Sequence, residues 1–295
     1  MKIVFSRKGF DSALGGCPSP VLEPDGAMVS LPIPLASERV RFCDVRWEGT
    51  DLGEVVEDLS RGRVQADART HLDPDLRRGA LPRKPGWRAL FGQSGKAQAH
   101  LARHRVGPGD VFLFYGWFRR AARQDDRLGY VRDTPDMHAV FGWLQVETVF
   151  PAAYGCPPGL AWAAGHPHFT LERSVESANN TVYLAAGRLQ LPGEKCGDLP
   201  GAGAFARFAD DLCLTAVAEG PATPRSLWRL PKWFWSPRRD DRLSHHEDPD
   251  RWQRRRDHLL LRAASRGQEF VLDADRYREA LPWLHWLIRT GHRRT

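Results

Sequence analysis

Two stretches decide the fold: Val106-Gly-Pro-Gly-Asp-Val-Phe-Leu-Phe-Tyr115 and His138-Ala-Val-Phe-Gly-Trp-Leu-Gln-Val-Glu-Thr-Val149. In the first, a Gly-Pro-Gly-Asp turn leads into five apolar residues, which predicts a tight turn followed by a buried strand. The second predicts another long strand, in which Gly142 lets a ligand or a second backbone approach closely. The polar segment 119–136 between them is typical of a hairpin-like connection.

Shorter elements are predicted around this pair of strands. Lys2–Ser6 has the composition of a first strand, and Ser94 precedes a helix that reaches His104. A helix is also predicted over Pro249–Ala264, with Asp248 as its cap, and a last one over Pro282–Arg289. Strands and helices are mixed and do not strictly alternate. We therefore predict an α+β fold, with a mixed, partly closed β-sheet or small barrel, surrounding helices and a basic helical C-terminal region.

The composition is that of an ordinary globular protein. Of the 295 residues, 42% are hydrophobic and 27% are charged, which excludes a largely disordered chain. No apolar run approaches the roughly 18 residues that span a membrane, and the N-terminus lacks the pattern of a secretory signal. The five cysteines include no CxxC pair, which argues against a disulfide framework. We expect a cytoplasmic protein without a membrane partner.

The positive charge is concentrated at the C-terminal end. The chain has 43 Lys and Arg against 36 Asp and Glu, a net charge of +7, and residues 221–295 hold the whole excess. We therefore divide the chain into an α+β core (1–220) that carries the candidate site and an Arg- and Trp-rich region (221–295) packed on it, unless both form one domain. Four arginines of the predicted basic helix are candidates for contact with a nucleic-acid backbone, the alternative being a solvated helix face. They are Arg251, Arg254, Arg255 and Arg256.

A glycine-flanked loop after the first strand offers groups that bind anions. Arg7 and Lys8 can hold a phosphate, and Gly9 lets the backbone approach it closely. Ser6 and Asp11 belong to the same candidate substrate-binding segment. The alternative is a surface turn with solvated charges.

His71, Asp73 and Asp75 place an imidazole and two carboxylates within five residues. Two carboxylates brought close together can divide the roles of general acid and general base, so these three are the candidate catalytic residues. Helix capping by either aspartate is the alternative, and a part in a metal site is another.

No metal or cofactor is assigned from the sequence. His166 and His168 flank Pro167 and offer two imidazoles, but the sequence shows no third ligand near them. They can equally pack a loop.

Other polar and aromatic residues are candidates for recognising a base. Gln93 can read a base edge, although the surrounding Gly92-Gln-Ser-Gly-Lys96 lacks the spacing of a phosphate-binding P-loop. Tyr115, Trp117 and His138 lie on or near the two long strands, where an aromatic ring can stack on a base. A plain aromatic core is the alternative. The chain has no Ser-His-Asp order, GxSxG elbow or GxGxxG fingerprint, which argues against a standard hydrolase or dinucleotide enzyme.

The Gly-Asp turn and the two long strands resemble the small β-barrels of the PUA, ASCH and EVE type over about 45 residues. That resemblance implies binding of RNA or of modified bases.

A broader resemblance runs from residue 1 to the C-terminal quarter. Several blocks in one order resemble the third type of nucleotide modification associated domain, a family linked to systems that modify nucleic-acid bases. The blocks are Ser6-Arg-Lys-Gly-Phe-Asp-Ser12 with Gly15-Gly16 and Ser19-Pro20, His71-Leu-Asp-Pro-Asp75, Gly92-Gln-Ser-Gly95, Phe112-Leu-Phe-Tyr-Gly-Trp-Phe118, and His138 with Phe141-Gly142.

These observations favour a protein that binds a nucleotide or a nucleic-acid base in a polar cleft and takes part in base modification. In that hypothesis Ser6–Asp11, His71–Asp75, Gln93 and His138 line one cleft. Two alternatives stay open, a non-catalytic reader of modified bases in DNA or RNA and an enzyme that acts on free nucleotides.

Overall fold

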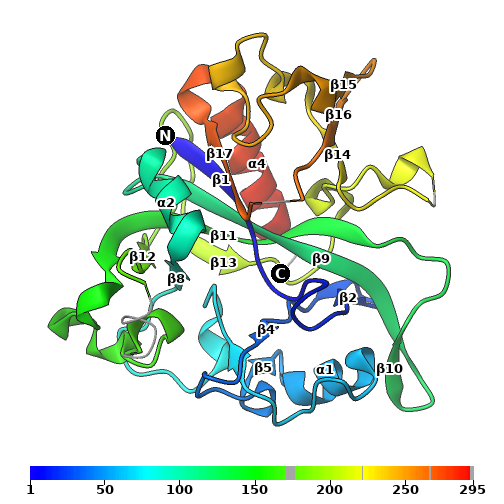
Figure 1. Cartoon of the computed structure of the whole chain (residues 1–295), viewed down its shortest axis with the longest axis vertical. Coiled ribbons are helices and arrows are strands. Elements are labelled where there is room, and N and C mark those ends of the chain that lie inside the picture. The colour runs from blue at the N-terminus through cyan, green and yellow to red at the C-terminus, as the bar shows by residue number, and fades with distance from the viewer. Residues whose placement is uncertain (171–176, 221, 266, 293–295) are drawn as a thin grey trace.

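The fold is built around two long antiparallel strands. The computed structural model describes residues 1–170, 177–220, 222–265 and 267–292. Strands β9 (Val111–Gln124) and β11 (Met137–Pro151) cross the centre of the molecule (Figure 1). They are the two strands that the apolar runs predict, extended at their ends by the polar hairpin with β10 (Arg127–Tyr130).

These strands belong to a large mixed sheet that is open and not closed into a barrel. Its main path runs β17-β1-β9-β11-β12-β8, with β1 parallel to β9 and the other neighbours antiparallel. The predicted α+β class is confirmed. The other strands of this sheet are β1 (Lys2–Arg7), β2 (Ser19–Leu22), β3 (Ala27–Met28), β8 (Leu90–Gln93), β12 (Thr181–Ala185), β13 (Ala202–Ala204) and β17 (Glu269–Asp273).

Helices and small sheets lie beside this sheet. Helix α1 (Leu52–Ser60) lies near β4 and β5, and helix α4 (Ala280–His292) lies across the central strands from them (Figure 1). Helix α2 (Gly95–Arg103) follows β8, with Ser94 at its predicted N-cap position. Among the described residues, no helix combines the length and the apolar character needed to cross a membrane. Small sheets are formed by β4 (Ile33–Pro34) with β7 (Thr70–His71), by β5 (Arg46–Trp47) with β6 (Thr50–Asp51), and by β14 (Leu227–Leu230) with β16 (Leu259–Arg262) and β15 (Trp252–Arg254).

The hydrophobic core joins the two ends of the chain. Phe5 of β1 packs against Trp228 and Phe234 from the C-terminal region. Strand β17 pairs with β1 in the register Phe5↔Phe270. The Arg- and Trp-rich region therefore contributes both a strand and aromatic core residues to the central sheet.

The predicted basic helix over Pro249–Ala264 is wrong. The cap signal is real but short: Asp248 Oδ1 accepts a hydrogen bond from Asp250 N at 2.9 Å, and only a 3-10 turn follows (Pro249–Arg251). The chain then forms β15 and β16, which pair Trp252 with Leu261. Apolar residues at these positions suit one face of a helix or two short strands around a turn, and periodicity alone does not distinguish the two.

Gly142 allows a close backbone approach, as its position in the strand predicts. A β-bulge lies between Val140 and Gly142 in the pairing with β9, and β13 runs along the other side of β11. A Cβ atom at Gly142 would lie 2.5 Å from Leu76 Cδ1 and 2.8 Å from Gly203 O. The site therefore has no space for a side chain.

Replacing Gly142 with alanine should lower the free energy of unfolding by about 1–3 kcal/mol, because the backbone of β13 must shift. Urea denaturation followed by Trp fluorescence measures this change. The matched control is Gly129→Ala in β10, where nothing lies within 4 Å of the added Cβ. Equal stability of Gly142→Ala and wild type would contradict the close packing.

Candidate functional site

Six residues singled out from the sequence line one cavity of about 170 Å³. They come from three distant segments: the end of β1 and its following loop, the segment that begins at β7, and β8. His168 also lines this cavity. We call it the polar cavity. The six residues are Arg7, Lys8, Asp11, His71, Asp73 and Gln93.

The loop after β1 reaches the cavity because β1 and β2 pair in succession along the same side of β9. Strand β1 pairs with Val111–Tyr115, and β2 pairs with residues 118–121. The intervening chain leaves the sheet between the two strands. Asp11 Oδ1 closes this loop by accepting hydrogen bonds from Ala13 N and Leu14 N at 2.8 and 2.7 Å.

Glu269 lies behind one wall of the cavity and holds its residues in place through hydrogen bonds. Its side chain is fully buried, and Oε1 accepts hydrogen bonds from Ser6 Oγ at 3.0 Å, Lys8 Nζ at 3.2 Å and Gln93 Nε2. The Gln93 carbonyl oxygen accepts a bond from Ser94 N. Ser6 is therefore buried beneath the cavity, and the charge of Lys8 is paired. Arg7 forms no salt bridge with a carboxylate of the described residues; its Nη1 donates to Ser265 O at 3.3 Å.

Asp73 lies among three imidazoles. Its Oδ2 is 3.9 Å from His71 Nε2 and 3.8 Å from His168 Nε2, while Oδ1 is 3.4 Å from His166 Nε2. Oδ1 also accepts a hydrogen bond from Gly92 N at 2.8 Å. All four side chains are buried.

Burial and these contacts set the protonation of the group. Burial alone would raise the pKa of Asp73, but the contact with His166 and the neighbouring imidazoles outweigh it and hold the pKa below its usual range. Burial lowers the pKa of His168 to about 3, so this ring is neutral at pH 7. The site therefore holds an ionised carboxylate beside at least one neutral imidazole.

Gly92 makes room for His168. A Cβ atom at Gly92 would lie 2.2 Å from the Cγ and Cδ2 atoms of the His168 ring. His168 comes from a 3-10 turn (Pro167–Phe169), whose Phe169 packs with residues of β8 and β12 in a hydrophobic cluster. The ring therefore lies directly on the strand that carries Gln93.

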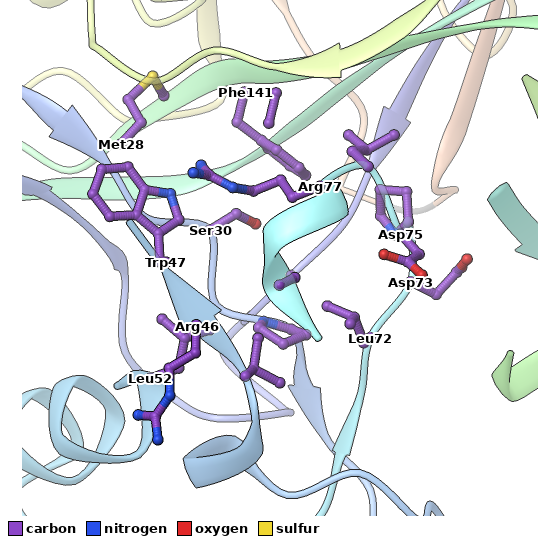
Figure 2. Close-up of a pocket in the computed structure, with 17 residues that line it drawn as sticks. Met28, Ser30, Arg46, Trp47, Leu52, Leu72, Asp73, Asp75, Arg77 and Phe141 are labelled. Atoms are coloured by element: carbon purple, nitrogen blue, oxygen red, sulfur yellow. The ribbon is translucent and has the colours of Figure 1, made fainter. Parts of the chain in front are cut away.

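Asp75 lies apart from this cluster. It forms a bidentate salt bridge with Arg83, at 2.7 and 2.5 Å, and its backbone pairs with Leu90 at the edge of β8. Asp73 and Asp75 border an apolar cavity of about 60 Å³ on the other side of the loop. Figure 2 shows both carboxylates on one side of this cavity, across from Trp47 and Met28. The two aspartates thus have different partners, and their carboxylates do not form the acid–base pair that their spacing in the sequence suggested.

His138 and Trp117 line a neighbouring cavity of about 580 Å³, which shares Arg7 and Asp11 with the polar cavity. His138 is buried, and its Nδ1 accepts a hydrogen bond from Trp228 Nε1 at 3.0 Å. Trp117 is covered by the guanidinium of Arg225, 4.2 Å from the ring centroid.

Two further groups of candidates lie away from both cavities. Tyr115 is buried in the core, where its ring packs edge-on against Trp228. Arg251 is half-buried and donates to Arg262 O at 3.1 Å, whereas Arg254–Arg256 are exposed on β15 and its turn. Figure 1 shows β15 near the top of the molecule and β8 on its left side, about halfway down.

Two residues behind the site, Glu269 and Glu38, have no distinctive signal in the sequence. Glu269 begins a late strand, and Glu38, a hydrogen-bond partner of His71, lies in a connecting segment. The two histidines around Pro167 can be recognised from the sequence as possible metal ligands. Their neighbours in space, His71 and Asp73, lie about a hundred positions earlier in the chain. Only the folded chain shows that these groups meet.

A family model described as nucleotide modification associated domain 3 matches residues 2–273, which include both cavities. No curated protein and no solved structure matches the chain.

Replacing Glu269 with glutamine should lower the free energy of unfolding by about 3 kcal/mol, because Lys8 loses its buried counter-ion. Adding Lys8→Met should restore much of this loss, and urea denaturation of the four-member mutant cycle measures the coupling. As a control, Asp198→Asn in the exposed Arg188–Asp198 pair should change stability by at most about 0.5 kcal/mol. Additive effects of the two buried substitutions would contradict the pairing.

His138 should make stability fall as the solution is acidified. Burial lowers its pKa to about 3, whereas an unfolded histidine titrates near 6.5. Below pH 6.5 this histidine is protonated in the unfolded state but stays neutral in the folded state. It therefore lowers the free energy of unfolding by about 2 kcal/mol between pH 7 and pH 5. The variant His138→Gln, denatured by urea at both values, should show a fall smaller by that amount. Identical falls in the two proteins would refute it.

Proposed function

Because the chain belongs to the nucleotide modification associated domain 3 family, we propose that it is an enzyme that modifies a nucleotide or a nucleic-acid base bound in the polar cavity. The observation that carries this proposal is the convergence of an arginine, a buried Asp73 and two imidazoles on one cavity. One ligand in this cavity can therefore contact both a cation that binds its phosphate and the carboxylate and imidazoles that can act on it.

Arg7 is the residue proposed to meet the phosphate. Lys8 is paired with Glu269, which leaves Arg7 as the lining cation best able to form charge-assisted hydrogen bonds with an anion. Arg7 also lines the neighbouring cavity, together with Arg119 and Arg225. This arrangement supports a substrate whose anionic groups extend beyond one phosphate.

The group of Asp73, His71 and His168 favours catalysis over simple recognition. A reader of modified bases needs stacking surfaces and hydrogen-bond donors or acceptors that face the base. Asp73 is instead a buried carboxylate that lies between imidazoles, and its pKa is strongly lowered. Such perturbed groups are typical of sites that perform chemistry. Gln93 is held by Glu269 and Ser94, so we assign it a supporting position in the wall.

Replacing Arg7 with alanine should weaken nucleotide binding ten- to a hundred-fold, the worth of one charge-assisted hydrogen bond. Isothermal titration calorimetry with the four deoxynucleoside and the four ribonucleoside 5′-monophosphates, and with a 20-nucleotide single-stranded DNA, measures it. Arg278→Ala, on a side chain that is 92% exposed, is the matched control. If no probe binds, or if Arg7→Ala binds like wild type, this assignment of the cavity is wrong.

Charge reversal of Arg254, Arg255 and Arg256 to glutamate separates polymer from free nucleotide. If these three arginines bind a nucleic-acid backbone, the variant has a lower affinity for the single-stranded DNA, and that binding depends less on salt. Binding of monophosphates is unchanged. Mass analysis of the DNA and of the nucleotide pool before and after incubation then separates an enzyme from a reader. Tight binding without any change in mass would favour the reader.

A further inference from the structure

We propose that His71, Asp73 and His168 bind one divalent transition-metal ion at the inner end of the polar cavity. One ring nitrogen of each histidine and a carboxylate oxygen of Asp73 lie within 4.8 Å of one another, and all three residues are buried. They come from β7, the loop after it and the turn at Pro167–Phe169. The proposal does not require a nucleotide substrate.

When each ring is neutral, its hydrogen bond at Nδ1 leaves Nε2 without a proton. Asn180 Nδ2 donates to His168 O at 2.9 Å, which fixes the amide so that its Oδ1 faces His168 Nδ1 at 2.6 Å. Because that oxygen only accepts, His168 Nδ1 carries the hydrogen. His71 Nδ1 likewise faces the Glu38 carboxylate at 2.9 Å. In the neutral rings, both Nε2 lone pairs therefore face Asp73.

This pattern matches the support that metal-binding histidines receive. A ligating imidazole typically donates its other N–H to a carboxylate or carbonyl group, which fixes the tautomer and the ring orientation. Glu38 and Asn180 supply these acceptors here. On the opposite side, Gly92 N and His166 Nε2 approach Oδ1 of Asp73, so that Oδ2 is the oxygen turned toward His71 and His168.

The distances suit a shared cation better than direct hydrogen bonds. Nε2 of His71 and Nε2 of His168 lie 3.9 and 3.8 Å from Asp73 Oδ2, beyond the range of a hydrogen bond. Two ligands that are each about 2.1 Å from one ion stand roughly 3–4 Å apart. The two Nε2 atoms and Asp73 Oδ2 are therefore near one another without a direct hydrogen bond from either ring nitrogen to this oxygen.

The donor set indicates the class of ion. Two imidazoles and one carboxylate suit Zn²⁺ or Fe²⁺, whereas Mg²⁺ prefers oxygen ligands. Three protein ligands leave coordination positions open, and the ligands line the same cavity as Arg7. We infer a site that presents its ion to a ligand in the cavity. The part of His71 and Asp73 is then to hold this ion, which replaces the proton transfer that their spacing in the sequence suggested.

The full-length protein, stripped with a chelator, should bind one Zn²⁺ or one Fe²⁺ per chain. Calorimetry under anaerobic, reducing conditions should show at least hundred-fold tighter binding of one of these ions than of Mg²⁺. Asp73→Asn and His168→Gln should each weaken that binding at least hundred-fold. Gly92→Ala keeps all three ligands but displaces the His168 ring, and should weaken it about ten-fold.

His258→Gln is the matched control, because this histidine also contacts carboxylates, at Asp257 and Glu219, but lies outside the polar cavity. Its metal content should equal that of wild type. Circular dichroism checks that each variant is folded, and bound metal should raise the melting temperature of wild type but not of Asp73→Asn. The proposal is overturned if wild type binds less than about 0.2 equivalents of either ion at saturation. It is also overturned if both ligand variants bind the ion as tightly as wild type. Arg7→Ala tests nucleotide binding separately.

Discussion

The structure around the polar cavity depends on one constraint: a carboxylate removed from water must be paired with donors or cations. Asp73 and Glu269 are both buried; Asp73 lines the cavity, and Glu269 lies behind its lining residues Lys8 and Gln93. Glu269 ties Ser6, Lys8 and Gln93 together, and so joins β1, β8 and β17. Asp73 ties the loop after β7 to Gly92 of β8. The segments that form the cavity are therefore held together by the partners of two acidic side chains.

The central elements could be predicted because their signals are local and strong. The apolar runs that become β9 and β11, the helix that begins after Ser94 and the strand at Lys2–Ser6 each depend on neighbouring residues only. The error at Pro249–Ala264 has a physical origin. A cap, an N-terminal proline and spaced apolar residues suit a helix. The same spacing also suits two short strands, and in the structure Trp252 pairs with Leu261 across such strands.

The candidate site was predicted in part, and the boundary follows the same logic. Polar residues beside glycines at strand ends identify loops that gather around a ligand, and Arg7, Asp73 and Gln93 do meet. The sequence could not show that Asp75 pairs with Arg83, or that Lys8 is held by Glu269 across most of the chain. Such pairings depend on tertiary packing, which a single sequence does not reveal.

The charges near the polar cavity connect the two proposals. Arg7 and Lys8 face Asp11 and Asp73, and the carboxylates of Glu38 and Glu269 lie directly behind the lining residues. Lys8 is paired with Glu269, and the ring of His168 is neutral at pH 7. A phosphate that comes near Asp73 is repelled by its buried carboxylate, and the low dielectric of a buried site strengthens that repulsion. A divalent cation between His71, Asp73 and His168 balances that charge, so the ion that the imidazoles would bind also makes the cavity suitable for an anionic nucleotide.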